Sequence, residues 1–243
     1  MPDRPVVLVT HVRHFVGPGA VRRLLAEDMT VVCHDAAFAQ PQEREAFLAE
    51  IPRAEVLART DPAEIVAETV ERFGRLDALV SNDPYPAIRA PVDMADPEEF
   101  RRALEALAVW PFTVIGKAAA VMKAARAGRI VIITSAAPLT GIPNYAMYAA
   151  ARGAANALVP SLAKELARWG ITVNAIAPNY IKNPDYFPPE LLADDAAMSK
   201  MLKNIPLGRL GEPEEVAELI ALFASGRCGF VTGHVLPIAG GWA

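Results

Sequence analysis

Residues 128–135 read Gly-Arg-Ile-Val-Ile-Ile-Thr-Ser, a short apolar and β-branched run that ends in two hydroxyl side chains. A loop rich in Pro and Gly follows, so the run is typical of a buried strand that ends at Ser135. Residues 146–154, AMYAAARGA, then begin an Ala-rich helix. We therefore expect a buried strand, a loop and a helix in direct succession.

The same alternation extends along the chain in both directions. Apolar, β-rich runs predict strands at residues 5–10, 30–33, 55–57, 78–81, 128–135, 172–177 and 234–237. Amphipathic patterns predict helices at 20–28, 42–49, 62–73, 96–125 with a bend near Pro111, 144–169, 193–203 and 213–224. Strands that alternate with helices predict an α/β fold, a doubly wound, Rossmann-like parallel sheet with helices on both faces. We see no linker or repeat, and expect a single domain over residues 1–243.

The composition is that of an ordinary soluble globular protein, with 53% hydrophobic and 21% charged residues among 243. The net charge of −4 and the absence of a basic block argue against nucleic acid as a partner. We find no charged leader and no uncharged apolar stretch of about 18 residues, so we expect no membrane association and a cytoplasmic protein. Cys33 and Cys228 are far apart and the four histidines form no ligand motif, so we expect no metal site.

The helix that follows residue 146 carries a candidate acid/base pair. Tyr148 and Arg152 are four residues apart, which places them on one helix face with Cβ atoms about 5–6 Å apart. If the helix returns past the end of the preceding strand, both side chains converge with Ser135. A guanidinium favours the phenolate of a tyrosine, whose ordinary pKa is about 10, and a serine hydroxyl can hold a substrate oxygen. The alternative is a solvated helix face beside an ordinary strand end.

The turn after the first strand is where a dinucleotide would contact backbone, and it reads THVRHFVGPG over residues 10–19. With the Ser-Tyr-Arg set, this arrangement resembles the short-chain dehydrogenase/reductase family, whose turn is TGxxxGxG and whose site is Ser…YxxxK. His11 stands at the first glycine of that pattern and Phe15 at the second. Gly17 alone matches the third, so bulky side chains occupy the place of the cofactor.

Three further segments depart from that family in the same direction. Arg152 replaces the lysine of YxxxK, residues 81–84 read SNDP in place of NNAG, and residues 178–180 read PNY where PG is usual. Asp35 does stand where an NAD-binding member places its ribose carboxylate, although an acid after a strand is commonly a turn residue. A chain that keeps the acid/base pair and loses the cofactor contacts indicates chemistry without hydride transfer, so we expect no cofactor.

That combination resembles the halohydrin dehalogenases, relatives of the same family with a Ser-Tyr-Arg site, an aromatic residue in the first turn and a halide pocket. The resemblance extends over nearly the whole chain. It implies cofactor-independent conversion of vicinal haloalcohols to epoxides and halide, and the reverse opening of epoxides by small anions such as azide, cyanide or nitrite. It also implies a homotetramer. Tyr148 would be the base, Arg152 would lower its pKa, and Ser135 would position the substrate oxygen.

A leaving halide needs hydrogen-bond donors in an apolar cavity, and the loop after the sixth strand can supply backbone amides. We assign the halide pocket to Phe15, Pro178, Asn179, Tyr180 and Ile181. We assign the substrate pocket to Asn82, Ala137, Pro138, Leu139, Tyr186 and Phe187. Phe15, Tyr186 and Phe187 can instead be plain core or interface side chains. Two other functions stay open: an oxidoreductase that binds NAD through Asp35, and a catalytically silent protein that binds a ligand or regulates a partner.

Overall fold

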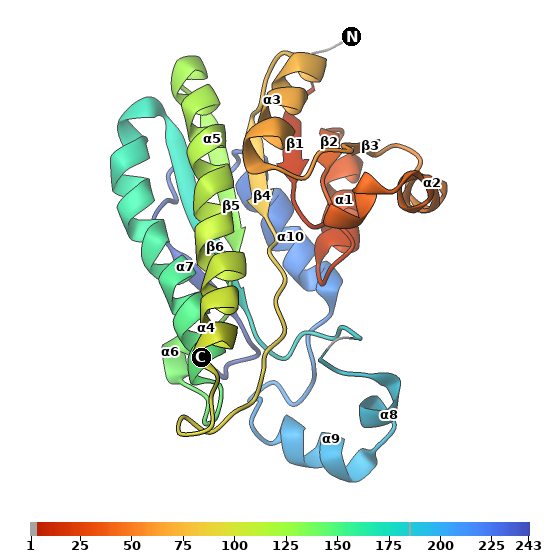
Figure 1. Ribbon diagram of the computed structural model, residues 1–243, viewed down its shortest axis with the longest axis vertical. Coiled ribbons are helices and arrows are strands. Elements are labelled where there is room, and N and C mark those ends of the chain that lie inside the picture. Colours follow the sequence, from red (N-terminus) through yellow and green to blue (C-terminus); the bar gives the residue numbers. More distant parts are fainter. Residues whose placement is uncertain (1–3, 185) are drawn as a thin grey trace.

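The computed structural model describes residues 4–184 and 186–243, and its centre is a seven-stranded parallel sheet (Figure 1). The strand order is β3-β2-β1-β4-β5-β6-β7. The strands are β1 (Val6–Val9), β2 (Thr30–Cys33), β3 (Glu55–Val56), β4 (Ala78–Ser81), β5 (Gly128–Ile133), β6 (Ile171–Pro178) and β7 (Val235–Ile238). This arrangement confirms the predicted doubly wound α/β fold. The strand order reverses between β1 and β4, and ligands bind such folds in the crevice at that point.

Helices cover both faces of the sheet. They are α1 (Gly17–Ala26), α2 (Pro41–Glu50), α3 (Pro62–Phe73), α4 (Pro97–Leu104), α5 (Trp110–Ala125), α6 (Ala137–Thr140), α7 (Ala146–Leu166), α8 (Pro189–Leu192), α9 (Asp195–Leu202) and α10 (Pro213–Ala224). Helices α1 and α10 pack against each other on one face, and α3, α5 and α7 cover the other (Figure 1). Helices α8 and α9 lie beyond the carboxyl ends of the strands, at the bottom of that view.

Alternate residues of each strand enter two separate cores. In β1, Val7 and Val9 pack beneath α1 and α10, whereas Val6 and Leu8 pack beneath α3 and α5. All four side chains are at most 3% exposed. Because both faces of the sheet are covered, its strands read as continuous apolar runs rather than as alternating patterns.

The predicted helix over 96–125 is one helical segment with an irregular centre. A π-helical turn, Glu105–Val109, separates α4 from α5. Pro111 has no N–H for the carbonyl four residues before it, and its ring crowds that carbonyl, so a widened turn directly before it relieves the conflict. Trp110, the first residue of α5, packs on His11 of the first βα turn, with the two ring centroids 4.6 Å apart. Its ring centroid is also 5.6 Å from that of His34, which follows β2.

This 29-residue segment, Pro97–Ala125, is also long and apolar enough to cross a membrane by length and composition alone. Its most apolar window has a mean hydropathy of 1.4 and is 33% buried. In the fold it packs through α5 on β4, β5 and α3. Val109 and Phe112 remain exposed on it, so the segment is apolar on more than the face that meets the sheet.

Candidate functional site

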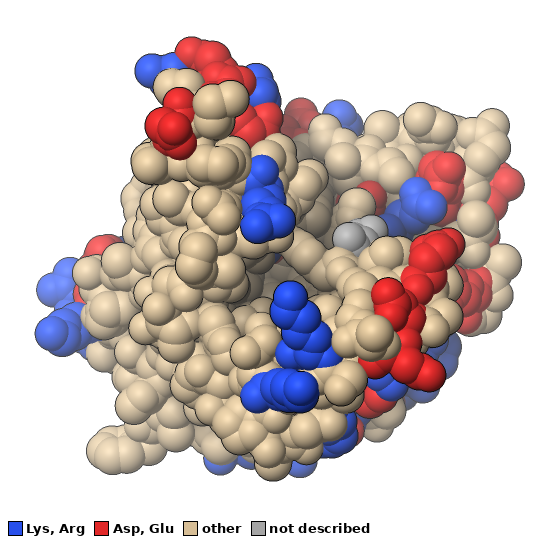
Figure 2. Space-filling view, turned by 90° about the horizontal axis from the view of Figure 1, so that it is seen from below, with Lys and Arg blue, Asp and Glu red and all other residues tan. Residues whose placement is uncertain are grey.

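A cavity of about 810 Å³ opens at the carboxyl ends of the strands, beside the point where the strand order reverses. Figure 2 views the molecule from this edge and shows the face hollowed, with Lys and Arg side chains near the hollow. Most residues predicted for the site line this cavity: Phe15, Asn82, Ser135, Ala137, Tyr148, Arg152, Pro178, Asn179, Tyr180, Ile181, Tyr186 and Phe187. The volume is in the range of small-molecule sites.

Arg152 connects the base candidate to the sheet through three hydrogen bonds. Its Nε donates to the Tyr148 hydroxyl oxygen at 3.3 Å, and its Nη1 donates to the carbonyl of Ile133 at 3.1 Å. Its Nη2 donates to the carbonyl of Asp83 at 3.0 Å. The side chain is 6% exposed. Each nitrogen of the planar guanidinium thus meets an acceptor on a different segment, which fixes the cation beside the phenol.

Ser135 lies two residues beyond the end of β5, which stops at Ile133 rather than at Ser135 as predicted. Its Oγ accepts a hydrogen bond from the N–H of Ala137 at 3.1 Å, and its carbonyl accepts one from Asn156 on α7 at 3.2 Å. These bonds join the strand end to the helix that carries Tyr148. The serine is 4% exposed, so its hydroxyl is held in a fixed place in the cavity wall.

The environment of Tyr148 favours its charged form. Burial is the largest single influence and raises the pKa of this phenol, but the positive charge of Arg152 and several hydrogen bonds together outweigh it. Hydrogen bonds from Arg152, Tyr186 and Ser135 act in the same direction, and the pKa of Tyr148 lies below its ordinary value. A phenol with a lowered pKa in a cavity can accept a proton from a bound hydroxyl group.

The first βα turn keeps a glycine-like backbone although two of its glycines are replaced. His11 and Phe15 have φ values of 48° and 49°, in the left-handed region that favours glycine. A Cβ on Gly17 would lie 2.3 Å from the carbonyl oxygen of Val12, so this position requires glycine. Asn82 donates from Nδ2 to the carbonyl of His11 at 3.0 Å, which ties the turn to β4.

The residues around this turn do not fit a dinucleotide. The ring of His11 packs on Trp110, and Phe15 lines the cavity, so side chains fill the approach that glycines leave open to a pyrophosphate. Asp35 is 2% exposed, and its two carboxylate oxygens accept from the N–H groups of Arg13 and Ala37 at 3.1 and 3.0 Å. The carboxylate of Asp35 therefore binds backbone N–H groups of the first turn and of the short 3₁₀ helix Ala36–Ala39, which it caps.

The loop after β6 was expected to offer several backbone N–H groups to a halide, but not all of them are available. The N–H of Tyr180 donates to Oδ1 of its neighbour Asn179 at 3.0 Å, so this amide is already paired. Nδ2 of Asn179 is buried and has no partner among the residues that the structure describes. Ile181 forms a parallel bridge with Gly211 through the flanking Tyr180 carbonyl and Lys182 N–H, which leaves its own N–H on the opposite side.

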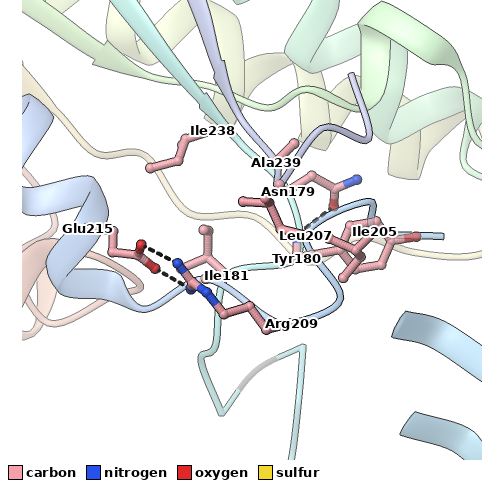
Figure 3. A pocket seen from close by; sticks show the side chains of 11 residues that line it. Asn179, Tyr180, Ile181, Ile205, Leu207, Arg209, Glu215, Ile238 and Ala239 are labelled. Carbon is pink, nitrogen blue, oxygen red and sulfur yellow. Dashed lines mark hydrogen bonds and ion pairs between the residues drawn. The ribbon is translucent and has the colours of Figure 1, made fainter. Parts of the chain in front are cut away.

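Asn179, Tyr180 and Ile181 also line a second cavity of about 70 Å³ (Figure 3). Arg209 and Glu215 form a two-bond ion pair there, with both N–O distances 2.7 Å. The three loop residues therefore form the wall between the two cavities. The ion pair borders the same second cavity.

Two residues assigned to the substrate pocket lie elsewhere. Pro138 and Leu139 are on α6 and are not among the residues that line the large cavity. Pro138 packs toward Gly153 on α7, and Leu139 is 48% exposed. The short helix turns both side chains away from the site, whereas Ala137 at its start lines the cavity.

Sequence reasoning missed other residues of the cavity. They come mainly from two loops, and they are His14, Asp83, Pro84, Tyr85, Pro86, Ala87, Ile133, Thr134, Ile142, Tyr145 and Asn183. Asp83 is the most informative of them. Its carboxylate accepts from Ser81 at 2.6 Å and lies 3.1 Å from Nδ1 of His11, while its carbonyl accepts from Arg152. A signal existed in the SNDP segment, because residues 81–84 depart there from the family pattern NNAG.

The chain is similar to proteins described as reductases, dehydrogenases and dehalogenases. The family model described as enoyl-(acyl carrier protein) reductase matches residues 14–243. A cis-4-hydroxycyclohexanecarboxylate dehydrogenase of Sinomonas cyclohexanicum is 34% identical over 243 residues, covering 98% of this chain and 96% of the relative.

Two solved structures are similar over almost their whole length. One, described as a dehalogenation enzyme, is 50% identical with a TM-score of 0.96, covering 99% of each chain. The other is a halohydrin dehalogenase (HheC) bound to ethyl (2S)-oxiran-2-ylacetate, 37% identical with a TM-score of 0.93, covering 97% of this chain and 96% of that one. With the family model and the curated relative, they show that this chain belongs to the short-chain dehydrogenase/reductase family.

Proposed function

We propose that this protein converts vicinal haloalcohols to epoxides and halide ions without a cofactor. The observation that carries the proposal is the Tyr148–Arg152 pair in a cavity whose cofactor side is filled by side chains. The similarity to a dehalogenation enzyme and to a halohydrin dehalogenase that holds an epoxide supports the same reaction.

The reaction needs a base and alignment. The Tyr148 phenolate takes the proton from a substrate hydroxyl that the Ser135 hydroxyl holds. The alkoxide oxygen then forms a bond to the neighbouring carbon, and the carbon–halogen bond breaks with its electron pair on the halide. Because nucleophile and leaving group belong to one molecule, the entropic cost of their meeting is low. The protein therefore supplies little beyond proton transfer and orientation.

The departing halide meets neutral donors. We assign this role to the unpaired Nδ2 of Asn179 and the N–H of Ile181, in place of the already paired N–H of Tyr180. Phe15 and Pro178 supply apolar walls on either side. Neutral donors stabilise an anion in a low-dielectric cavity without holding it as a cation would, so the ion can leave.

The rest of the cavity would receive the carbon skeleton of the substrate. Asn82, Ala137, Tyr186 and Phe187 line it, with the aromatic side chains coming from the segment after β6. In the reverse direction, a small anion such as azide would occupy the halide position. Tyr148 would then donate its proton to the oxygen of the opening epoxide.

A nucleotide-dependent oxidoreductase is the alternative, favoured by the dehydrogenase relatives. Halide release from bromoethanol, measured without nucleotide, separates the two. We expect release by the wild type and a loss of at least about 100-fold in Tyr148→Phe, because general-base catalysis typically contributes that much. The control is Arg101→Lys on the surface of α4, outside the cavity lining, and it should leave halide release unchanged. Tyr186 cannot serve as a control tyrosine, because it lines the cavity itself. No release from several haloalcohols, together with NADH binding, would return the protein to the oxidoreductases.

We also propose a cytoplasmic homotetramer. Val109 and Phe112 on the segment Pro97–Ala125 are 47% and 53% exposed, which is the character of a helix that meets another subunit. Light scattering of the purified protein tests the assembly. A monomeric mass at micromolar concentration would refute it.

A further inference from the structure

Residues 83–86, Asp-Pro-Tyr-Pro, form a stiff stretch in the loop after β4. Each proline fixes its own φ angle, and the ring of Pro86 also confines the residue before it to extended backbone. Tyr85 therefore holds its backbone carbonyl in a nearly fixed direction. Its phenol donates to the carboxylate of Glu99 on α4, and this carboxylate also accepts from Arg102. The loop is thus anchored to α4 through the side chain of Tyr85.

Tyr186 belongs to a different segment, between β6 and α8, and its backbone is held by a buried side chain. Oδ1 of Asn183 accepts from the N–H of Tyr186 at 3.0 Å, and Nδ2 of Asn183 donates to the carbonyl of Ile181 at 3.1 Å. Asn183 is 9% exposed. The turn that carries Tyr186 is therefore tied directly to the end of β6.

A hydrogen bond joins these two segments, which both reach beyond the carboxyl ends of the strands (Figure 1). The hydroxyl of Tyr186 donates to the carbonyl of Tyr85 at 3.2 Å. In the sheet, β4 and β6 lie on either side of β5, and Ser135 follows β5. The bond therefore spans the carboxyl end of β5, where Ser135 lies. We call this bond the mouth bridge.

The mouth bridge lies at the outer side of the cavity. Both of its tyrosines line the cavity, and Tyr186 is 38% exposed. Ser135 and Arg152 line the same cavity and are only 4% and 6% exposed. The reacting groups thus form the floor, and a molecule that approaches them from solvent has to pass the bridge.

We propose that Tyr186 is a specificity-determining residue, because the mouth bridge admits narrow molecules and delays wide ones. The cavity of about 810 Å³ has room for a substituent of two fused rings, so the interior does not exclude such a group. The opening that the bridge divides is what a wide, rigid group has to pass. The choice of haloalcohols as test substrates rests on the proposed function, whereas the access that the bridge controls can be measured without turnover.

The moving part of the mouth is the side chain of Tyr186. The carbonyl of Tyr85 is held by its two neighbouring prolines and by the bond to Glu99, and Ala90 further along the loop donates to the carbonyl of Asn144 at 2.8 Å. An exposed side chain changes rotamer rapidly, and a hydrogen bond between neutral groups is only modestly stable. The bridge therefore opens and closes on a backbone that stays in place.

Tyr186→Phe removes the donor and keeps the ring, and Tyr186→Ala removes the ring as well. Stopped-flow fluorescence with naphthylethanol, a wide fluorescent alcohol without halogen, gives the association rate constant. We expect a rise of about fivefold in Tyr186→Phe, which is the increase in the open fraction that the loss of one neutral hydrogen bond produces. Tyr186→Ala should associate faster still. An association rate constant that is unchanged in both variants would overturn the proposal.

Turnover supplies the second measurement. The ratio of kcat/KM for naphthylethanol brominated next to its hydroxyl-bearing carbon to that for bromoethanol should rise in Tyr186→Phe. An unchanged ratio would show that the bridge does not select substrates. If no protein releases halide from either compound, the proposed function fails, and the association rate of naphthylethanol alone decides the role of the bridge.

Tyr145→Phe is the matched control, because Tyr145 also lines the cavity and its hydroxyl takes no part in the mouth bridge. It should leave the association rate constant of naphthylethanol within about twofold of the wild type. If Tyr145→Phe raises that constant as much as Tyr186→Phe does, loss of any polar group from the wall is the cause, and the proposal fails.

Discussion

Replacing Arg152 with lysine keeps the positive charge but removes the planar guanidinium, whose three nitrogens each donate a hydrogen bond. The guanidinium gives one nitrogen each to Tyr148, to the Ile133 carbonyl and to the Asp83 carbonyl. A lysine presents a single nitrogen and can retain good geometry to one of them. The two carbonyls belong to residues that are 2% and 4% exposed, so the loss leaves buried acceptors unpaired.

Each unpaired buried carbonyl costs about 1–3 kcal/mol, which gives a loss of about 4 kcal/mol in the free energy of unfolding. For a domain of this size that corresponds to a fall of about 10 °C in Tm. The ammonium is also more strongly hydrated than a guanidinium and no longer fixed beside the phenol, so we expect halide release at neutral pH to fall about tenfold or more.

Thermal unfolding and halide release on the same preparations test both parts. Arg101→Lys, whose guanidinium pairs with Glu98 at the surface, is the matched control and should change the free energy of unfolding by no more than about 0.5 kcal/mol. If Arg152→Lys unfolds within about 2 °C of the wild type and releases halide at the same rate, the fork is not what positions the base.

The other predictions concern the first turn, a buried histidine and the pH dependence of the reaction. Gly17→Ala should cost about 3 kcal/mol in urea unfolding, because its Cβ would meet the Val12 carbonyl at 2.3 Å, whereas Gly116→Ala, with nothing within 4 Å, should gain about 0.5–1 kcal/mol. Burial, and then the charge of a neighbouring histidine, lower the pKa of His34 from 6.5 to about 4 in the folded protein, so only the unfolded chain binds its proton between these values. The protein should therefore lose about 3 kcal/mol of stability as the pH falls from 6.5 to 4, and His34→Leu should flatten that slope in pH-dependent unfolding. Halide release should decline as the pH is lowered, because the Tyr148 phenolate is lost. Epoxide opening by azide should decline as the pH is raised, because Tyr148 must then donate a proton, and parallel profiles in the two directions would contradict its role.

The sheet could be predicted from the sequence because its strands are buried on both faces. Segments with helical periodicity lie between the apolar runs of β1, β4 and β5, and this alternation predicts a parallel α/β arrangement. Helix boundaries were less accurate where backbone chemistry decided them. The predicted bend near Pro111 is a π-helical turn, whose extra residue periodicity does not reveal.

The cluster of Ser135, Tyr148 and Arg152 could be predicted from local sequence patterns. An apolar run indicated where β5 ends, and the spacing of four residues placed Tyr148 and Arg152 on one face of α7. The loops could not be predicted, because their side-chain directions depend on contacts made far along the chain. Pro138 and Leu139 turn away on α6, and the bridge from Tyr186 to Tyr85 joins residues 101 positions apart. No periodicity signals such a contact.

The strand order also has a consequence for how the molecule is made. Val7 of β1 pairs with Ala78 of β4, about 70 residues later, so one edge of β1 has no neighbour until that much more chain has been synthesised. Parallel pairings between strands distant in the sequence form slowly, and an uncovered apolar strand edge promotes aggregation. The cavity is completed later still, when the segment that carries Tyr186 reaches the loop after β4. We therefore expect yield in expression at low temperature to exceed that at high temperature, with the base assembled only at the end of folding.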